Sequence, residues 1–322
     1  MSIENLAVIT TGGDAPGMNA VIRAIVRTTI YRKHKIFGIE RGWRGLAEGR
    51  IEELELKSVG GIINRGGTIL QTSRTPEFQQ KKFRAKAVGE LQKRGIDGLI
   101  VIGGNGSMRS AATIARECGI KVNLVPASID NDVPGTDETI GFDTAVNTAV
   151  EAIDKIRDTA TSHQQLFVVQ VMGRDNGFVA VRVGLACGAE SILIPEVKYN
   201  VRHICDNLQR GQQRGKKSSI IVMAEGAGDI IDFARIIGRH SGMDVRISIL
   251  GHMQRGGSPT AQSRFLAAKL GNAAVESILA GRHGIVVGWK RGSIAFTPFT
   301  RAMKEKRSID VSSMHLAEIL AK

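Results

Sequence analysis

Two aspartates separated by one residue, Asp130 and Asp132, are the side chains best suited to chemistry in this 322-residue sequence. They follow the apolar run 122–125 in a polar segment that we do not expect in the core. In an extended segment alternate side chains point the same way, so both carboxylates would face one reaction centre. One could take a proton from a hydroxyl while the other serves a metal ion, as phosphoryl transfer requires. The alternative is an Asp-rich turn without a ligand, because Asp and Asn favour turns.

Two glycine-rich turns each follow an apolar run and precede a helical pattern. The first contains Gly12 and Gly13 after residues 6–10. The second, residues 103–107, follows the run 98–102 and precedes a helix expected from about Met108. A strand, a glycine turn and a helix place backbone N–H groups and a helix N-terminus where a phosphate can bind. Neither turn matches the dinucleotide or P-loop fingerprint, and a tight turn without a ligand would look similar.

Strand-like and helix-like patterns alternate along the whole chain, which predicts parallel sheets covered by helices. The predicted fold class is therefore α/β, with two doubly wound lobes of mostly parallel sheet. The main helical patterns are 139–158 and 260–280. The predicted strands are 7–10, 36–39, 98–102, 122–125, 166–171, 191–194, 219–224, 245–250 and 285–287.

Taken together, these segments resemble the bacterial-type 6-phosphofructokinase family. Further matching motifs are NRGGT at 64–68, SR at 73–74, GFDTA at 141–145, MGR at 172–174, IPE at 194–196, Glu225 and GHMQRGG at 251–257. The resemblance covers residues 3–288 and implies an ATP-dependent kinase that phosphorylates fructose 6-phosphate at the 1-position. It also implies Mg²⁺ as cofactor and a homotetramer with sites completed across interfaces.

The same resemblance implies how the chain is divided. A nucleotide-binding lobe would comprise residues 1–138 plus about 251–300. A sugar-phosphate-binding lobe would comprise residues 139–250 plus about 301–322. The helix expected at 139–158 would bridge the lobes, with the active site in the cleft between them.

The resemblance also assigns roles to single residues. Asp130 would be the general base, Asp132 would serve the metal, Ser128 would lie near the transferred phosphoryl group, and Arg74 would bridge the two phosphates. The planar, permanently charged guanidinium of an arginine suits spread negative charge. The ATP-binding positions would be Gly12, Gly13, Trp43, Arg74, Gly104, Asn105, Gly106 and Ser107. The substrate-binding positions would be Ser128, Asp130, Asp132, Met172, Gly173, Arg174, Glu225, Arg246, His252 and Arg255. The metal positions would be Asp132 and Asn105, and the effector positions Arg23, Arg27, Glu190 and Lys216. For Trp43, expected against the adenine, ordinary packing is an equal alternative.

The sequence departs from the family pattern at several of these positions. Asn105 stands where the family usually has Asp at the magnesium site, and Gln165 stands where an Arg usually reaches the sugar phosphate of a neighbouring subunit. Leu56, Gly61 and Gln79 also differ, so the effector site is expected to be only partly intact. These changes leave open a non-catalytic or regulatory subunit, or a kinase for another sugar phosphate. Gly106 and Ala127 leave room for a nucleotide, which makes pyrophosphate the least expected donor.

The composition limits the remaining classes of function. The net charge of +13 favours polyanions, but the basic residues are spread and aromatic residues make up only 4%, so dedicated nucleic-acid binding is not expected. The basic run 301–307 predicts a solvated surface helix. No apolar run approaches the roughly 20 residues of a membrane span. The three cysteines, Cys118, Cys187 and Cys205, are too scattered for a zinc site, which favours a reducing, cytoplasmic setting.

Overall fold

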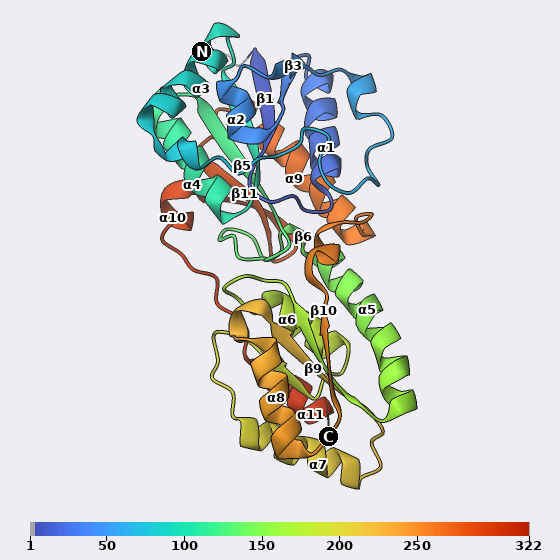
Figure 1. The fold of residues 1–322 in the computed structure, drawn as a ribbon. Coiled ribbons are helices and arrows are strands. Elements are labelled where there is room, and N and C mark those ends of the chain that lie inside the picture. The colour runs from blue at the N-terminus through green and yellow to red at the C-terminus, as the bar shows by residue number, and fades with distance from the viewer. Residues whose placement is uncertain (1–3, 322) are drawn as a thin grey trace. The chain divides into compact units, whose positions relative to one another are not determined.

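The computed structural model describes residues 4–321, except for the side chain of Cys118. The chain divides into two compact units (Figure 1). Unit 1 comprises Met1–Thr144 and Arg255–Arg307, and unit 2 comprises Ala145–Gln254 and Ser308–Lys322. Each unit therefore combines two stretches of sequence that lie far apart along the chain. Among the described residues, no helix is long and apolar enough to cross a membrane.

Unit 1 is built on an eight-stranded sheet in the order β12-β11-β5-β4-β1-β2-β3, with β6 paired to β5. Neighbouring strands are parallel except at the two edges, where β11 pairs with β12 and β2 with β3 in antiparallel fashion. The strands of this sheet are β1 (Asn5–Thr10), β2 (Lys35–Ile39), β3 (Ile51–Glu53), β4 (Gly98–Gly103), β5 (Lys121–Ser128), β6 (Ile140–Gly141), β11 (Ile285–Lys290) and β12 (Ser293–Pro298).

Helices cover both faces of this sheet. Helices α1 and α9 pack against each other on one face. On the other face α2, α3, α4 and α10 bury apolar side chains such as Leu91 and Met108 against Ile9 and Val101 of the strands. Alternate strand residues point to opposite faces, so these buried strands are apolar on both. The helices are α1 (Met18–Tyr31), α2 (Gly42–Ala47), α3 (Lys81–Lys93), α4 (Asn105–Cys118), α9 (Ala261–Leu279) and α10 (Phe299–Ala302), with 3-10 turns at Leu56–Val59 and Pro76–Gln79.

Unit 2 has a four-stranded sheet in the order β10-β7-β9-β8, and all of its strands are parallel. Helices α7 and α8 bury residues such as Leu208 and Phe233 against one face, while α6 and α11 pack on the other. Helix α5 (Phe142–His163) begins in unit 1 and continues into unit 2. The other elements are β7 (Leu166–Val171), β8 (Ser191–Leu193), β9 (Ser219–Ala224), β10 (Val245–Ile249), α6 (Phe178–Ala186), α7 (Val201–Gln213), α8 (Ile230–Ser241) and α11 (Ser312–Leu320), with 3-10 turns at Glu225–Ala227 and Gly251–Arg255.

The predicted α/β class with mostly parallel sheets is confirmed, and every predicted strand is present with small shifts at its ends. The pattern missed β3, β6 and β12, which are short or lie at an antiparallel edge. Two helix predictions were wrong. The helix after β4 begins at Asn105 rather than near Met108, and the predicted surface helix at 301–307 ends at Ala302.

The parallel register of unit 1 brings three strand ends to one edge of the sheet. Thr10 of β1 pairs with Ile102 of β4, and Gly103 of β4 pairs with Pro126 of β5. The chain leaves β1 toward β2 on one side and returns as β4 on the other. This reversal of strand order is the place where open α/β sheets bind ligands beyond the carboxyl ends of their strands.

Candidate active site

The first glycine turn joins β1 to α1 and lies beside Arg255. Gly12 has a φ of 83°, a left-handed conformation that favours glycine. A Cβ on Gly13 would collide with the guanidinium of Arg255. The Nη1 of Arg255 donates to the carbonyl oxygen of Asp14 at 3.2 Å and to its carboxylate at 3.3 Å. Arg255, predicted to bind the sugar phosphate, is thus placed in unit 1 against the turn predicted for the donor phosphates.

The second glycine turn is the N-terminus of helix α4. Its N-cap residue, Gly104, has no side chain to cap the helix, so no side-chain acceptor satisfies the first N–H groups there. Ser107, in the first turn, donates from its hydroxyl to the carbonyl of Thr11 at 3.0 Å, which joins the two glycine turns. A Cβ on Gly104 would lie 3.5 Å from the Cβ of Ser128, at the end of β5. The free N–H groups of a helix N-terminus form an anion-binding site, and here they adjoin Ser128.

The segment carrying the two aspartates is neither extended nor outside the core, so the predicted conformation was wrong. Asp130 and Asn131 are each only 3% exposed. Asn131 has a φ of 54°, a left-handed turn. Its Oδ1 accepts the backbone N–H of Thr139 at 2.8 Å, and the Ser128 hydroxyl accepts the N–H of Asp130 at 3.2 Å. These internal bonds satisfy polar groups, which allows a polar loop to be buried.

Asn105 and Asp132, both predicted to serve the metal, are brought together. The Nδ2 of Asn105 donates to the Oδ2 of Asp132 and to its carbonyl oxygen, each at 3.0 Å. The amide therefore presents its donor to the carboxylate, because both partners are acceptors. Within residues 4–321 no three His, Cys, Asp or Glu side chains gather as a metal cluster. The contact thus brings one carboxylate and one amide together, and the metal role of both residues stays a prediction.

Arg74 and Trp43 differ sharply in exposure. Arg74 is exposed and makes no hydrogen bond or ion pair with any described residue, so its guanidinium is available to a ligand. Trp43 is 5% exposed and packs in the core of unit 1, with its ring centroid 4.9 Å from that of Phe78. The packing alternative accounts for the indole in this structure, and its role against adenine stays a prediction.

In unit 2, two predicted acceptor-side segments meet at the carboxyl ends of neighbouring parallel strands. Val171 of β7 pairs with Ala224 of β9. One carboxylate oxygen of Glu225 accepts the N–H groups of Gly173 at 3.2 Å and Arg174 at 2.5 Å. Gly173 and Arg174 both have positive φ, at 146° and 53°. Glu225 thus stabilises the backbone of the turn that begins at Met172. The side chain of Arg174 is exposed.

Arg246 and Gln165 converge on one carboxylate. The Nη2 of Arg246 lies 2.9 Å from Oδ2 of Asp244, and the Nε2 of Gln165 donates to the same oxygen at 2.6 Å. Arg246 lies on the edge strand β10, and Gln165 directly precedes the neighbouring strand β7. His252 is exposed in the turn after β10. The two positions expected to reach a neighbouring subunit therefore share a partner, although Gln165 contributes no charge.

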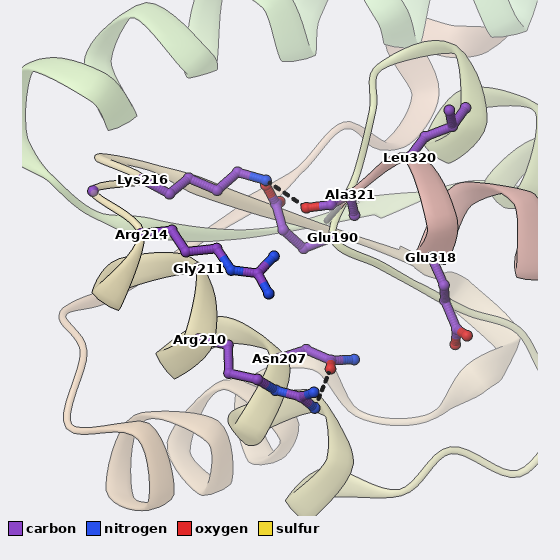
Figure 2. A pocket seen from close by; sticks show the side chains of 10 residues that line it. Glu190, Asn207, Arg210, Gly211, Arg214, Lys216, Glu318, Leu320 and Ala321 are labelled. Carbon is purple, nitrogen blue, oxygen red and sulfur yellow. Dashed lines mark hydrogen bonds and ion pairs between the residues drawn. The ribbon is translucent and has the colours of Figure 1, made fainter.

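A cavity of about 540 Å³ in unit 2 contains two of the predicted effector residues (Figure 2). The buried Glu190 forms an ion pair with Lys216 at 2.6 Å, and Lys216 also donates to the carbonyl of Ala321 at 3.2 Å. Arg210 of helix α7 and Arg214, its C-cap residue, also line it. Sequence reasoning missed these two arginines, which lie four residues apart at the end of the helix.

The other predicted effector residues, Arg23 and Arg27, lie on helix α1 of unit 1. They are also four residues apart, so they share one face of α1. Arg27 is exposed and Arg23 is half-buried. Leu56, which stands near where the family has an arginine, is 49% exposed.

Comparison with known proteins defines the class of this chain. A family model described as phosphofructokinase matches residues 5–278. The ATP-dependent 6-phosphofructokinase of Bacillus mycoides (strain KBAB4) is 50% identical over 319 residues, which cover 99% of this chain and 100% of the relative. The chain therefore belongs to the phosphofructokinase family.

Solved structures carry the same likeness. The phosphofructokinase of Saccharomyces cerevisiae matches with a TM-score of 0.91 and 33% identity, over 99% of this chain and 48% of that chain. The T-state phosphofructokinase of Pichia pastoris matches with a TM-score of 0.89 and 33% identity, over 94% of this chain and 36% of that chain. This chain thus spans about half or less of each yeast chain, while it spans the whole bacterial relative.

Proposed function

We propose that this chain transfers the terminal phosphoryl group of ATP to the 1-hydroxyl of fructose 6-phosphate, giving fructose 1,6-bisphosphate, a glycolytic reaction. One observation carries the proposal. In a chain 50% identical to a named ATP-dependent 6-phosphofructokinase, Asp130, Asp132 and Asn105 gather beside two glycine turns at one sheet edge. Two acidic side chains next to two phosphate cradles are the parts that phosphoryl transfer uses.

On the donor side, we assign ATP to the two glycine turns of unit 1. The N–H groups at the start of α4 and the open space over Gly106 would receive phosphate oxygens. Arg74, exposed and without a partner among the described residues, would neutralise the charge that develops on the transferred group. Asp130 would accept the proton of the sugar hydroxyl. This role requires the hydroxyl to bind within hydrogen-bond reach of the carboxylate.

On the acceptor side, we assign the sugar phosphate to residues of unit 2. Arg174, Arg246 and His252 are exposed cationic or titratable groups suited to a phosphate. Glu225 uses one carboxylate oxygen on the backbone, and its other oxygen would accept bonds from sugar hydroxyls. Arg255, whose side chain lies beside the first glycine turn, would serve phosphate groups as well.

A phosphofructokinase that uses ATP requires a metal cofactor, and we propose Mg²⁺. Asp132 and the phosphate groups would hold the Mg²⁺ ion. The ion would neutralise negative charge on the phosphates. Asn105 would orient the carboxylate of Asp132 through its amide N–H, while its amide oxygen is the atom that could serve the metal.

The alternatives raised by Asn105 and Gln165 are not favoured by the relatives, and ATP is the donor in their name. ATP and fructose 6-phosphate are thus the substrates. We further propose a cytoplasmic homotetramer, in which Arg246 contributes to a neighbouring site. The cavity with Glu190 and Lys216 would bind a phosphorylated effector, because three cationic side chains line it.

Turnover of the purified chain with ATP, Mg²⁺ and fructose 6-phosphate tests the function directly, together with an Asp130→Ser variant. Asp232→Ser is the matched control, because Asp232 is exposed on α8 and pairs with Arg235. We expect Asp130→Ser to lower kcat by roughly 10²- to 10⁴-fold, the range that a general base contributes. Binding of fructose 6-phosphate, measured by calorimetry, should be kept.

Normal turnover in Asp130→Ser would remove Asp130 from the base role. A wild-type protein that binds fructose 6-phosphate but never turns over, at any Mg²⁺ concentration, would instead favour a regulatory subunit. A panel with pyrophosphate as donor and sedoheptulose 7-phosphate and tagatose 6-phosphate as acceptors checks specificity. We expect ATP and fructose 6-phosphate to give the highest kcat/KM.

A further inference from the structure

Arg307, the last residue of unit 1, holds the loop that carries the two aspartates. It lies after α10, in a stretch, residues 305–310, that has no regular secondary structure. Its Nη1 donates to the carbonyl oxygen of Asn131 at 2.6 Å, and its Nη2 donates to the carbonyl oxygen of Asp137 at 2.8 Å. One planar side chain from the end of the unit thus ties together both ends of the segment 131–137.

The bond to the carbonyl of Asn131 lies between the two aspartates. The carbonyl of Asn131 belongs to the peptide unit that leads into Asp132, and a peptide unit is planar and rigid. Fixing this carbonyl therefore fixes the direction in which the chain enters Asp132. On its other side Asn131 is held by the N–H of Thr139. Asn131 is therefore held both at its backbone carbonyl and at its side chain. These bonds stabilise its left-handed conformation, which non-glycine residues seldom adopt.

The electrostatics of the guanidinium agree with this geometry. Burial lowers the pKa of Arg307, while the carboxylates of Asp137, Asp132 and Glu138 oppose that shift. The group stays charged, because an arginine does not lose its proton in a protein. The planar guanidinium can donate hydrogen bonds to two separated carbonyl groups at once, whereas the ammonium of a lysine has all its donors on one nitrogen.

We propose that Arg307 is a positioning residue for phosphoryl transfer, which acts by fixing the peptide unit between Asn131 and Asp132. The proposal rests on the proposed function, because it assigns Arg307 to the orientation of the base and the metal carboxylate. In this proposal Arg307 acts through the carbonyl groups of Asn131 and Asp137 and not on the substrates. Its loss should therefore slow the chemical step and leave the binding of both substrates largely unchanged.

The test compares Arg307→Met with Arg301→Met. Arg301 lies in the same basic segment, but its side chain is 72% exposed and pairs with Glu305, so its substitution removes the same charge without touching the loop. For each variant, kcat and both KM values are measured, and the number of ATP-binding sites per chain is counted by calorimetry. This count reports the folded fraction, which a merely structural role would lower together with the rate.

We expect Arg307→Met to lower kcat by roughly 10- to 100-fold, as a small displacement of catalytic groups does. Both KM values should stay within about threefold and the site count should not change. Arg301→Met should behave as the wild type. If Arg307→Met does not fold, Arg307→Lys takes its place under the same criteria, because lysine keeps the charge but cannot span both carbonyls.

Two outcomes would overturn the proposal. One is a kcat for the Arg307 variant within about twofold of the Arg301 variant, since orientation would then not depend on this side chain. The other is a rate that falls only in proportion to the site count, which would leave Arg307 a purely structural role. A wild-type protein without turnover would contradict the proposed function instead, so the two failures are distinguishable.

Discussion

At the scale of single residues, the contact between Asn105 and Asp132 bears on the metal site that we propose. A second carboxylate at position 105 would repel Asp132 unless a cation lay between them. The amide avoids this repulsion, because its N–H groups bond to Asp132 without a cation. The carboxylate is therefore already oriented before a metal arrives, at the cost of one negative charge.

The Asn105→Asp variant measures the cost of that lost charge. We expect it to bind Mg²⁺ more tightly, with the half-saturating concentration for turnover lowered by roughly tenfold, which corresponds to about 1.4 kcal/mol. Melting temperature as a function of Mg²⁺ and ATP provides a readout independent of activity. Asn200→Asp, which makes the same change at the N-cap of α7 in unit 2, is the control. An unchanged Mg²⁺ dependence in Asn105→Asp would show that position 105 does not contribute to the metal site.

The residue types of the site were visible in the sequence, but the conformation between them was not. The spacing of Asp130 and Asp132 suggested a shared direction on an extended chain. The structure instead places a left-handed residue, Asn131, between them in a buried loop. Sequence periodicity cannot show this, because the bonds that hold the loop come from Thr139, beyond the turn, and from Arg307, far away along the chain.

At the scale of elements, the strand ends were predicted well because apolar runs flanked by glycine mark buried parallel strands. The edges were not. Strand β12 turns back on β11 to form an antiparallel edge, and its residues alternate less clearly between buried and exposed positions. The basic run 301–307 was predicted as helix because charged residues at this spacing suit a solvated face, but α10 ends at Ala302.

Helix α7 carries the clearest functional consequence at this scale. Arg210 of this helix and Arg214 at its C-cap line the cavity that also contains Lys216 (Figure 2). With ADP as the probe of this proposed effector site, we expect Lys216→Met to weaken binding by roughly tenfold or more, since a hydrogen bond to a charged group contributes about 1.5–3 kcal/mol. Catalysis without an effector should change little.

Equilibrium binding of ADP in the presence of saturating fructose 6-phosphate and a non-hydrolysable ATP analogue isolates this cavity from the catalytic site. The control is Arg235→Met, which removes an exposed cation from α8 that pairs only with Asp232. Equal ADP affinity in the Lys216 and Arg235 variants would mean that the cavity does not bind phosphorylated effectors.

At the scale of the whole molecule, the net charge of +13 acts on substrates that are themselves anions. A positive protein attracts phosphate esters from a distance, and salt screens this attraction because the Debye length shortens as ionic strength rises. The excess is spread over the sequence rather than gathered in one run. It therefore raises the local concentration of any polyanion without selecting one.

This attraction predicts a salt dependence of kcat/KM. Between about 50 and 300 mM KCl we expect KM for ATP to rise by roughly three- to tenfold while kcat changes by less than twofold. Steady-state kinetics with ionic strength varied at fixed free Mg²⁺ provides the measurement. A kcat that falls in parallel with kcat/KM would point to loss of the active assembly at high salt rather than to screening.

The division of unit 1 into two stretches has a consequence for the protein while it is being synthesised. Strand β5 needs β11 as its neighbour, and α1 needs α9, but both partners follow the whole first stretch of unit 2 along the chain. At ordinary translation speeds β5 waits on the order of ten seconds for β11 to leave the ribosome. During that time the strand that leads into the two-aspartate loop has an unpaired edge, which is the kind of surface that chaperones shield and that neighbouring nascent chains can join.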